Sequence, residues 1–134
     1  MKIYTSYYGN TKKLRDANIQ IIGISQGKPS FVDCPFINQL APTRAMRSMT
    51  KSNYEVAYKQ HLSLINFDDI MQQIKLLSNG RDVALCCYES LKQPDDWCHR
   101  TMLADFFNQR KKQYNIQITE FQTEKQIIQQ LTLL

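Results

Sequence analysis

Residues 82–88 read Asp-Val-Ala-Leu-Cys-Cys-Tyr, a short and nearly continuous apolar run. Gly80 lies just before this run and the polar segment 89–96 follows it, so both ends carry turn signals. The pattern is typical of a central parallel strand that is covered on both faces. Because successive side chains on a strand point to opposite faces, we expect Cys86 and Cys87 to lie on opposite sides of the sheet.

Helices are predicted on both sides of this strand. Asn66 is expected to cap a helix that ends at Gly80, with two aspartates in its first turn. Ser52 or Asn53 is expected to cap an earlier helix that runs to about Ile65. A later helix is predicted from about His99 to Gln113. The buried stripes of these three helices are expected to comprise Tyr54, Tyr58, His61 and Leu62, then Ile70, Met71, Ile74 and Leu77, then Met102, Leu103, Phe106 and Phe107.

The rest of the chain predicts further strands that alternate with helices. Strands are expected at 2–7, 18–25 and, on an edge, 116–119, with a short helical turn at 12–17 and a terminal helix at 124–134. This alternation predicts a single α/β domain with a mostly parallel, Rossmann-like sheet flanked by helices. We assign residues 1–121 to that domain and 122–134 to a C-terminal helical tail of the same domain.

Composition limits the class of protein. The 134 residues are 43% hydrophobic, enough for one domain with a real core. No stretch approaches the roughly 18 apolar residues that span a bilayer, and the first residues do not resemble a signal peptide, so we predict a cytoplasmic protein without a membrane partner. In a reducing compartment, cysteines are expected to be core fillers, metal ligands or reactive thiols rather than disulfides. The four cysteines are Cys34, Cys86, Cys87 and Cys98.

The net charge of +5 has two interpretations. A lysine excess on a solvated surface explains it without a partner, whereas the alternative is an anionic ligand or nucleic acid. The densest basic run, Arg110 to Lys112, falls near a predicted helix end, where the helix dipole favours cations. The irregular segment 29–50, which contains three prolines, is either a binding loop or lid, or a poorly ordered excursion.

The predicted topology locates a site. In parallel sheets, ligands bind outside the carboxyl ends of the strands. Three segments follow predicted strands, namely 7–10, 25–28 and 88–100, and we expect them to converge on one crevice.

The last of these segments holds the densest group of reactive side chains. Glu89 follows the strand, and Cys98, His99 and Arg100 open the next helix. We assign Glu89, Cys98 and His99 as catalytic candidates, since a cysteine at a helix N-terminus favours its thiolate and a carboxylate can act as nucleophile or base. Arg100 opposes the helix dipole there, which indicates an anionic partner, either Glu89 or a ligand phosphate. The candidate ligand-binding residues are Tyr7, Tyr8, Gly9, Asn10, Ser25, Lys28, Trp97 and Arg100.

These motifs resemble a known family. The strand ending in Cys87-Tyr88-Glu89, followed by Trp97-Cys98-His99-Arg100, is similar to the signature of the family called domain of unknown function 488. The opening strand with its Gly9-Asn10 turn, the second strand Ile22-Gly23-Ile24-Ser25 followed by Pro29, and the segment Leu40-Ala41-Pro42-Thr43 resemble other parts of that family. Some members carry Asp-Val-Arg after the second strand, where this chain has Gly23-Ile24-Ser25. The resemblance implies the α/β fold and strengthens the site at Glu89 and Cys98 to Arg100, but implies no particular reaction.

Four functions compete. The first is binding of a small nucleotide-like or phosphorylated ligand, with its conversion left open; tyrosines and Trp97 would stack on a base. The second is thiol chemistry at Cys98, against which stands the rule that adjacent helical residues do not face each other. The third is a zinc site built on Cys87, Cys98 and His99, against which stands the lack of a Cys-x-x-Cys pair. The fourth is a nucleic-acid-binding module that uses the basic surface. We adopt the first, and assign no cofactor, no metal and no oligomeric state.

Overall fold

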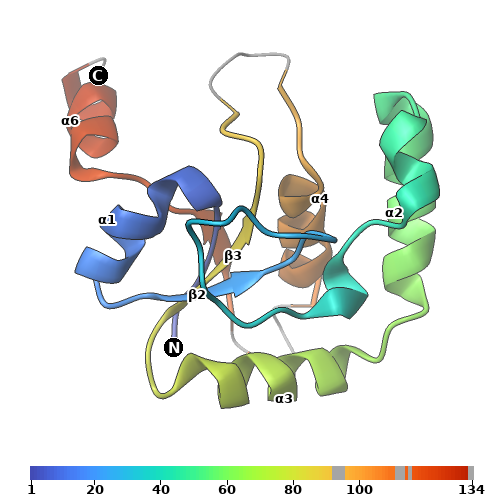
Figure 1. Cartoon of the computed structure of the whole chain (residues 1–134), viewed down its shortest axis with the longest axis horizontal. Helices are drawn as coiled ribbons and strands as arrows, with labels where there is room; N and C mark the ends of the chain where they lie inside the picture. Colours follow the sequence, from blue (N-terminus) through green and yellow to red (C-terminus); the bar gives the residue numbers. More distant parts are fainter. Residues whose placement is uncertain (92–95, 111–113, 115, 133–134) are drawn as a thin grey trace.

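The computed structural model describes residues 1–91, 96–110, 114 and 116–132. In chain order the strands and helices are β1 (Ile3–Tyr7), α1 (Thr11–Asp16), β2 (Gln20–Gly23), α2 (Lys51–Ser63), α3 (Phe67–Ser78), β3 (Val83–Cys87), α4 (His99–Asn108), β4 (Ile118–Glu120) and α6 (Glu124–Thr132). The strands form one parallel sheet in the order β2-β3-β1-β4 (Figure 1). The predicted single α/β domain with a parallel sheet is therefore confirmed.

The strand at 83–87 occupies the predicted central position. β3 pairs with β1 on one side and with β2 on the other, and all five of its residues are buried. Val83, Leu85 and Cys87 belong to the larger hydrophobic core, whereas Ala84 and Cys86 belong to a smaller core on the opposite face. The prediction that Cys86 and Cys87 point to opposite faces is thus confirmed.

The two faces of the sheet are covered differently. Helices α2, α3 and α4 contribute side chains to the larger core, and α1 contributes Leu14 to the smaller one (Figure 1). The predicted stripes of the three longer helices belong to the larger core, except that His61 is only half-buried. α6 has no buried residues and lies on the same side of the view as α1, away from α2, α3 and α4 (Figure 1).

Some of the observed helix ends differ from the predicted ones. Asn66 caps α3 through its side chain, as predicted, and Asn79 and Gly80 end that helix with positive φ angles. The cap of α2 is Thr50, not Ser52 or Asn53, since the Thr50 hydroxyl accepts the backbone N–H of Asn53. α4 ends at Asn108, so the predicted helix was too long within the described residues; positions 111–113 lie outside them.

The irregular segment packs against the end of β2. Gly23 forms a bridge with Phe36, and a Cβ atom at Gly23 would lie 2.6 Å from the Phe36 ring. Val32, Ile37, Leu40 and Met46 are buried, so the segment contributes to both cores. The segment 29–50 is packed into the fold and is not a poorly ordered excursion, and its role as a binding loop or lid stays a prediction.

None of the helices in the described part of the chain is long and apolar enough to cross a membrane.

Candidate functional site

A cavity of about 400 Å³ opens at the carboxyl ends of β2 and β3. Its walls come from the segments that follow these strands, from the start of α4, from α2 and from the loop before α2. The lining residues are Ser25, Gln26, Pro42, Arg47, Tyr54, Cys87, Tyr88, Glu89, Trp97, Cys98 and His99. The volume lies within the range of small-molecule pockets, roughly 300–1,000 Å³.

The deepest residues of this cavity are the most reactive. Cys87, Cys98 and His99 are buried, whereas Glu89 is exposed. The sulfur of Cys98 lies 3.1 Å from Oε2 of Glu89 and 3.5 Å from Nδ1 of His99. Both atoms can accept the thiol proton, so the cysteine has two candidate bases beside it.

The contact between Cys98 and His99 corrects one expectation. We argued that neighbours on a helix do not face each other, which disfavoured both a Cys98–His99 pair and a metal site that uses both residues. Cys98 is the N-cap of α4 and has extended backbone angles, φ −150° and ψ 151°. Because only His99 lies within the helix, the helical spacing rule does not apply to the pair.

The ring of His99 has a defined tautomer. Nε2 lies 2.7 Å from the backbone carbonyl oxygen of Ile24, and a carbonyl can only accept, so Nε2 carries the proton. Nδ1 therefore presents its lone pair to the cavity side, where Cys98 lies. Burial lowers the pKa of His99 to about 4, with a smaller contribution from the positive charge of Arg100. The imidazole is neutral at pH 7.

This burial predicts that the free energy of unfolding depends on pH. The prediction applies to protein treated with a chelator, in which no metal is bound to the His99 ring. The pKa of a histidine is about 6.5 in the unfolded chain and about 4 for His99 in the fold. As the pH falls from 6.5 to 4, the unfolded state binds the proton first, so the fold loses up to about 3 kcal/mol relative to its stability at pH 7. In urea unfolding, the difference in free energy of unfolding between the native chain and His99→Gln should therefore shrink as the pH falls through this window. The control is His61→Gln, which removes the other histidine; parallel curves for the native chain and His99→Gln would contradict the prediction.

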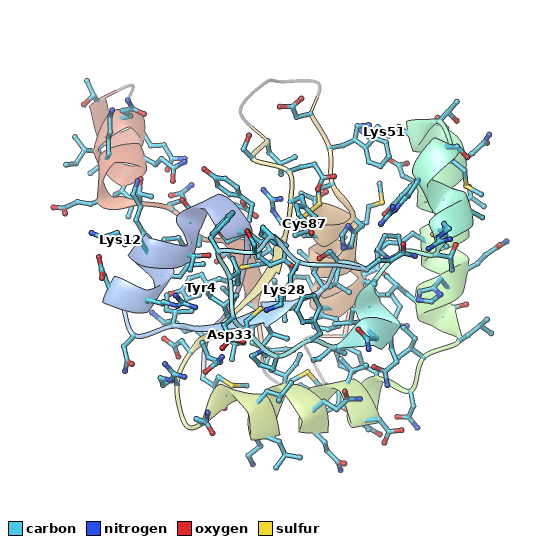
Figure 2. All side chains as sticks on the ribbon, viewed as in Figure 1. Tyr4, Lys12, Lys28, Asp33, Lys51 and Cys87 are labelled. Carbon is cyan, nitrogen blue, oxygen red and sulfur yellow. A yellow bond between two sulfur atoms is a disulfide. The ribbon has the colours of Figure 1, made fainter. Side chains whose placement is uncertain are left out.

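Cys87 and Cys98 meet at the floor of the cavity. Their sulfur atoms are in direct contact, as in a disulfide, which the sequence analysis did not favour. Figure 2 labels Cys87 where β3 passes α4. The two Cα atoms are 7.7 Å apart, whereas disulfides usually join Cα atoms about 4.4–6.8 Å apart. The backbone therefore holds the two thiols close together at a spacing wider than that of an ordinary disulfide.

Arg100 has a different partner from those we expected. Its side chain is fully buried, and its Nε and Nη2 donate to the carboxylate of Glu120 on β4, with the shortest contact at 2.9 Å. Its Nη1 donates to the backbone carbonyl of Glu89 and lies 3.1 Å from the sulfur of Cys87. Arg100 is thus occupied inside the protein and is not among the cavity's lining residues. It braces the site by joining β3, β4 and the loop after β3.

The other predicted residues divide among several surfaces. Ser25 and Trp97 line the cavity with the catalytic candidates. Tyr8 is buried and its hydroxyl bonds to Ser25 at 2.5 Å, so it supports the cavity from behind. Gly9 lines a separate cavity beside α1. Lys28 donates to the Val32 carbonyl and faces Asp33 at 3.8 Å (Figure 2).

Tyr7 and Asn10, two of the predicted ligand-binding residues, do not line this cavity. They line a different cavity, together with Glu120 and residues of α6. Tyr7 pairs with Cys87 in the sheet, but its ring lies under the guanidinium of Arg100, 5.9 Å from it, beside the Arg100–Glu120 pair and not in the cavity over β2 and β3. Only the second and third of the three predicted segments therefore meet in one cavity.

Arg47 and Tyr54 are among the cavity residues that were not predicted as site residues. Arg47 is exposed, and its side chain has no hydrogen bond or ion pair within the described residues. Tyr54 is buried and contacts the ring of Trp97, with centroids 4.8 Å apart. We treated Tyr54 as core and did not single out Arg47. For Arg47 the sequence signal was the irregular segment 29–50, one interpretation of which is a binding loop.

A second groove, of about 430 Å³, lies between α2 and α4. It shares Trp97 with the first cavity, and its other lining residues include Lys51, Glu55 and Asp105. No thiol or imidazole group is among its lining residues, so the first cavity is the better candidate for a reactive site.

The fold and the cavity define a single α/β domain with a cluster of thiol, imidazole and carboxylate groups at the carboxyl edge of its sheet. No protein-family model, curated protein or solved structure matches the chain.

Proposed function

We propose that the protein binds a small, negatively charged, nucleotide-like molecule in the cavity at the carboxyl ends of β2 and β3, and converts it with groups that include Glu89, Cys98 and His99. One observation carries the proposal: one cavity holds the reactive groups on its floor, and on its walls aromatic rings and a guanidinium that has no partner among the described residues. The resemblance of the two motifs to the family called domain of unknown function 488 remains part of this proposal.

The positive charge that binds the anionic group of the ligand comes from Arg47. Arg100 is neutralised by Glu120 and Lys28 is bound within its own loop, so neither is available to an anion in this cavity. Arg47 lines the cavity without a partner in the described residues, and a guanidinium can bind a phosphate through two parallel hydrogen bonds.

The planar part of the ligand is recognised by aromatic side chains. Trp97 is half-buried in the cavity wall and packs against Tyr54, which holds its ring in place. Tyr88 is half exposed, and its ring contacts that of Tyr8 with centroids 5.1 Å apart. A base or similar ring can stack on such surfaces, an interaction worth about 1–3 kcal/mol per base.

The experiment measures binding of AMP and of adenosine by calorimetry. We expect AMP to bind, and Arg47→Ala to weaken AMP about tenfold or more, since a hydrogen bond to a charged group contributes about 1.5–3 kcal/mol. Adenosine, which has no phosphate, should bind both proteins equally. Arg44→Ala is the matched control, because Arg44 lies in the same 3₁₀ turn but is not among the cavity's lining residues.

Two outcomes would contradict the proposal. If AMP and the other three nucleoside monophosphates do not bind, the nucleotide-like ligand is wrong. If Arg44→Ala and Arg47→Ala weaken binding alike and a short DNA strand binds with a steep salt dependence, the nucleic-acid alternative is favoured instead.

A further inference from the structure

The floor of the cavity holds three donor atoms that can share one metal ion. These atoms are Sγ of Cys87, Sγ of Cys98 and a ring nitrogen of His99, and all lie within 4.8 Å of one another. The residues come from the end of β3 and the start of α4, two elements that pack against each other. Thiolate and imidazole together are typical ligands of zinc.

The spacing of Cys98 and His99 suits two ligands of a tetrahedral ion. Zinc binds sulfur at about 2.3 Å and nitrogen at about 2.0–2.1 Å, so two such ligands of one tetrahedral ion lie about 3.6 Å apart. Sγ of Cys98 and Nδ1 of His99 are 3.5 Å apart. The Cα separation of 7.7 Å between Cys87 and Cys98 exceeds the usual disulfide range, so an ordinary disulfide does not account for the pair.

The second shell prepares His99 for a metal. Its Nε2 donates to the Ile24 carbonyl, which leaves the Nδ1 lone pair directed at the cysteines. Metal-bound histidines commonly donate their other ring N–H to a carbonyl or carboxylate, an arrangement that fixes the tautomer.

The charges also balance. Arg100 lies 3.1 Å from the Cys87 sulfur and favours its thiolate form, while Glu120 neutralises the arginine itself. Two thiolates neutralise the charge of a divalent cation, and the imidazole is neutral. A buried site with no net charge avoids most of the cost of burying ions.

We infer that Cys87, Cys98 and His99 bind a zinc ion whose fourth position faces the cavity and holds a water molecule. Catalytic zinc sites keep one position open in this way, and two cysteines with one histidine are a known donor set for them. Metal binding follows from the three donors alone, whereas the use of the water rests on the proposed function.

Glu89 is the proton acceptor for that water. Its Oε2 lies 3.1 Å from the Cys98 sulfur, which places a carboxylate beside the open position. One O–H bond of the water breaks and its proton passes to Glu89, while the hydroxide oxygen bonds to an electrophilic atom of the bound ligand. The bond to the leaving group then breaks, and that group takes the proton from Glu89. The step is a hydrolysis and needs no oxidant or reductant.

The experiment measures the metal content of full-length protein purified under reducing conditions without added chelator. We expect about one zinc per chain by elemental analysis, and its loss in Cys87→Ser, Cys98→Ser and His99→Gln. Cys34→Ser and Cys86→Ala are the matched controls, since Cys34 and Cys86 are the free cysteines on the other face of the sheet, and both should keep the metal. Glu89→Gln should also keep it, because Glu89 is not a required ligand.

Cobalt substitution tests the open position. Cobalt in the site should give a sulfur-to-metal charge-transfer band and tetrahedral d–d bands, and added thiocyanate should shift the d–d bands. An unchanged spectrum would overturn the water position.

Two further results would overturn the metal site. The first is metal-free protein that binds neither zinc nor cobalt on titration after reduction. The second is an intact mass that lacks two hydrogens under reducing conditions, with Cys87 and Cys98 joined in one peptide. AMP binding without metal would defeat this inference alone, and metal without binding of any nucleotide would defeat the proposed function alone.

Discussion

Glu120→Ala is expected to lower the free energy of unfolding by about 3 kcal/mol. The substitution leaves the guanidinium of Arg100, which is fully buried, without its charged partner. Breaking a buried ion pair by removing one partner typically costs about 3–5 kcal/mol. We expect the low end of that range, because the Glu120 side chain is 38% exposed and water can replace part of its interaction. The substitution also removes the acceptor of the Thr5 hydroxyl.

Urea unfolding of the variant provides the measurement. The control is Asp105→Ala, which removes an exposed carboxylate from α4 and should change stability by less than about 0.5 kcal/mol. Combining Glu120→Ala with Arg100→Met should cost less than the sum of the two single changes, because the uncompensated charge is then gone. Equal losses for Glu120→Ala and Asp105→Ala would show that the pair does not brace the fold.

Tyr58→Ala is expected to cost about 3–5 kcal/mol, through loss of a fully buried aromatic ring. Tyr58 lies on α2, and its hydroxyl donates to the Leu40 carbonyl at 2.6 Å, so it ties the irregular segment to the helix. Its ring also meets the His99 ring edge-on, with centroids 5.4 Å apart. Tyr58→Phe keeps the ring but leaves the buried carbonyl unsatisfied, and should cost about 1–3 kcal/mol.

The critical result is the order of the three stability losses, with Tyr58→Ala the largest, Tyr58→Phe intermediate and a surface control the smallest. Val56→Ala, on the exposed side of the same helix, should cost less than about 0.5 kcal/mol. Urea unfolding with an unchanged m-value measures all three variants on one scale. If Tyr58→Phe and the native chain are equally stable, the hydrogen bond to Leu40 does not hold the segment.

Local sequence patterns predicted the elements well. The apolar run at 83–87, the cap at Asn66 and the stop at Gly80 all act over a few residues, so the chain's own spacing identifies them. The cap of α2 was misplaced by a few residues, because Thr50, Ser52 and Asn53 are all suitable cap residues and only the backbone angles select one. The parallel sheet followed from the alternation of elements.

The candidate site was predicted only in part. The sequence groups Glu89, Cys98 and His99 because they flank one loop, and the structure brings them to one cavity with Ser25 and Trp97. The position of Cys98 at the N-cap reversed the argument against its contact with His99, since that argument assumed that both residues lie within the helix.

The sequence by itself determined the α/β class, the central strand and the location of a reactive cluster after it, because these depend on periodicity and on signals between near neighbours. Only the tertiary structure decided that Arg100 pairs with Glu120, that Tyr7 faces another cavity and that Arg47 faces this one. Those facts depend on strand order and on loop packing, which bring together residues that no local pattern relates.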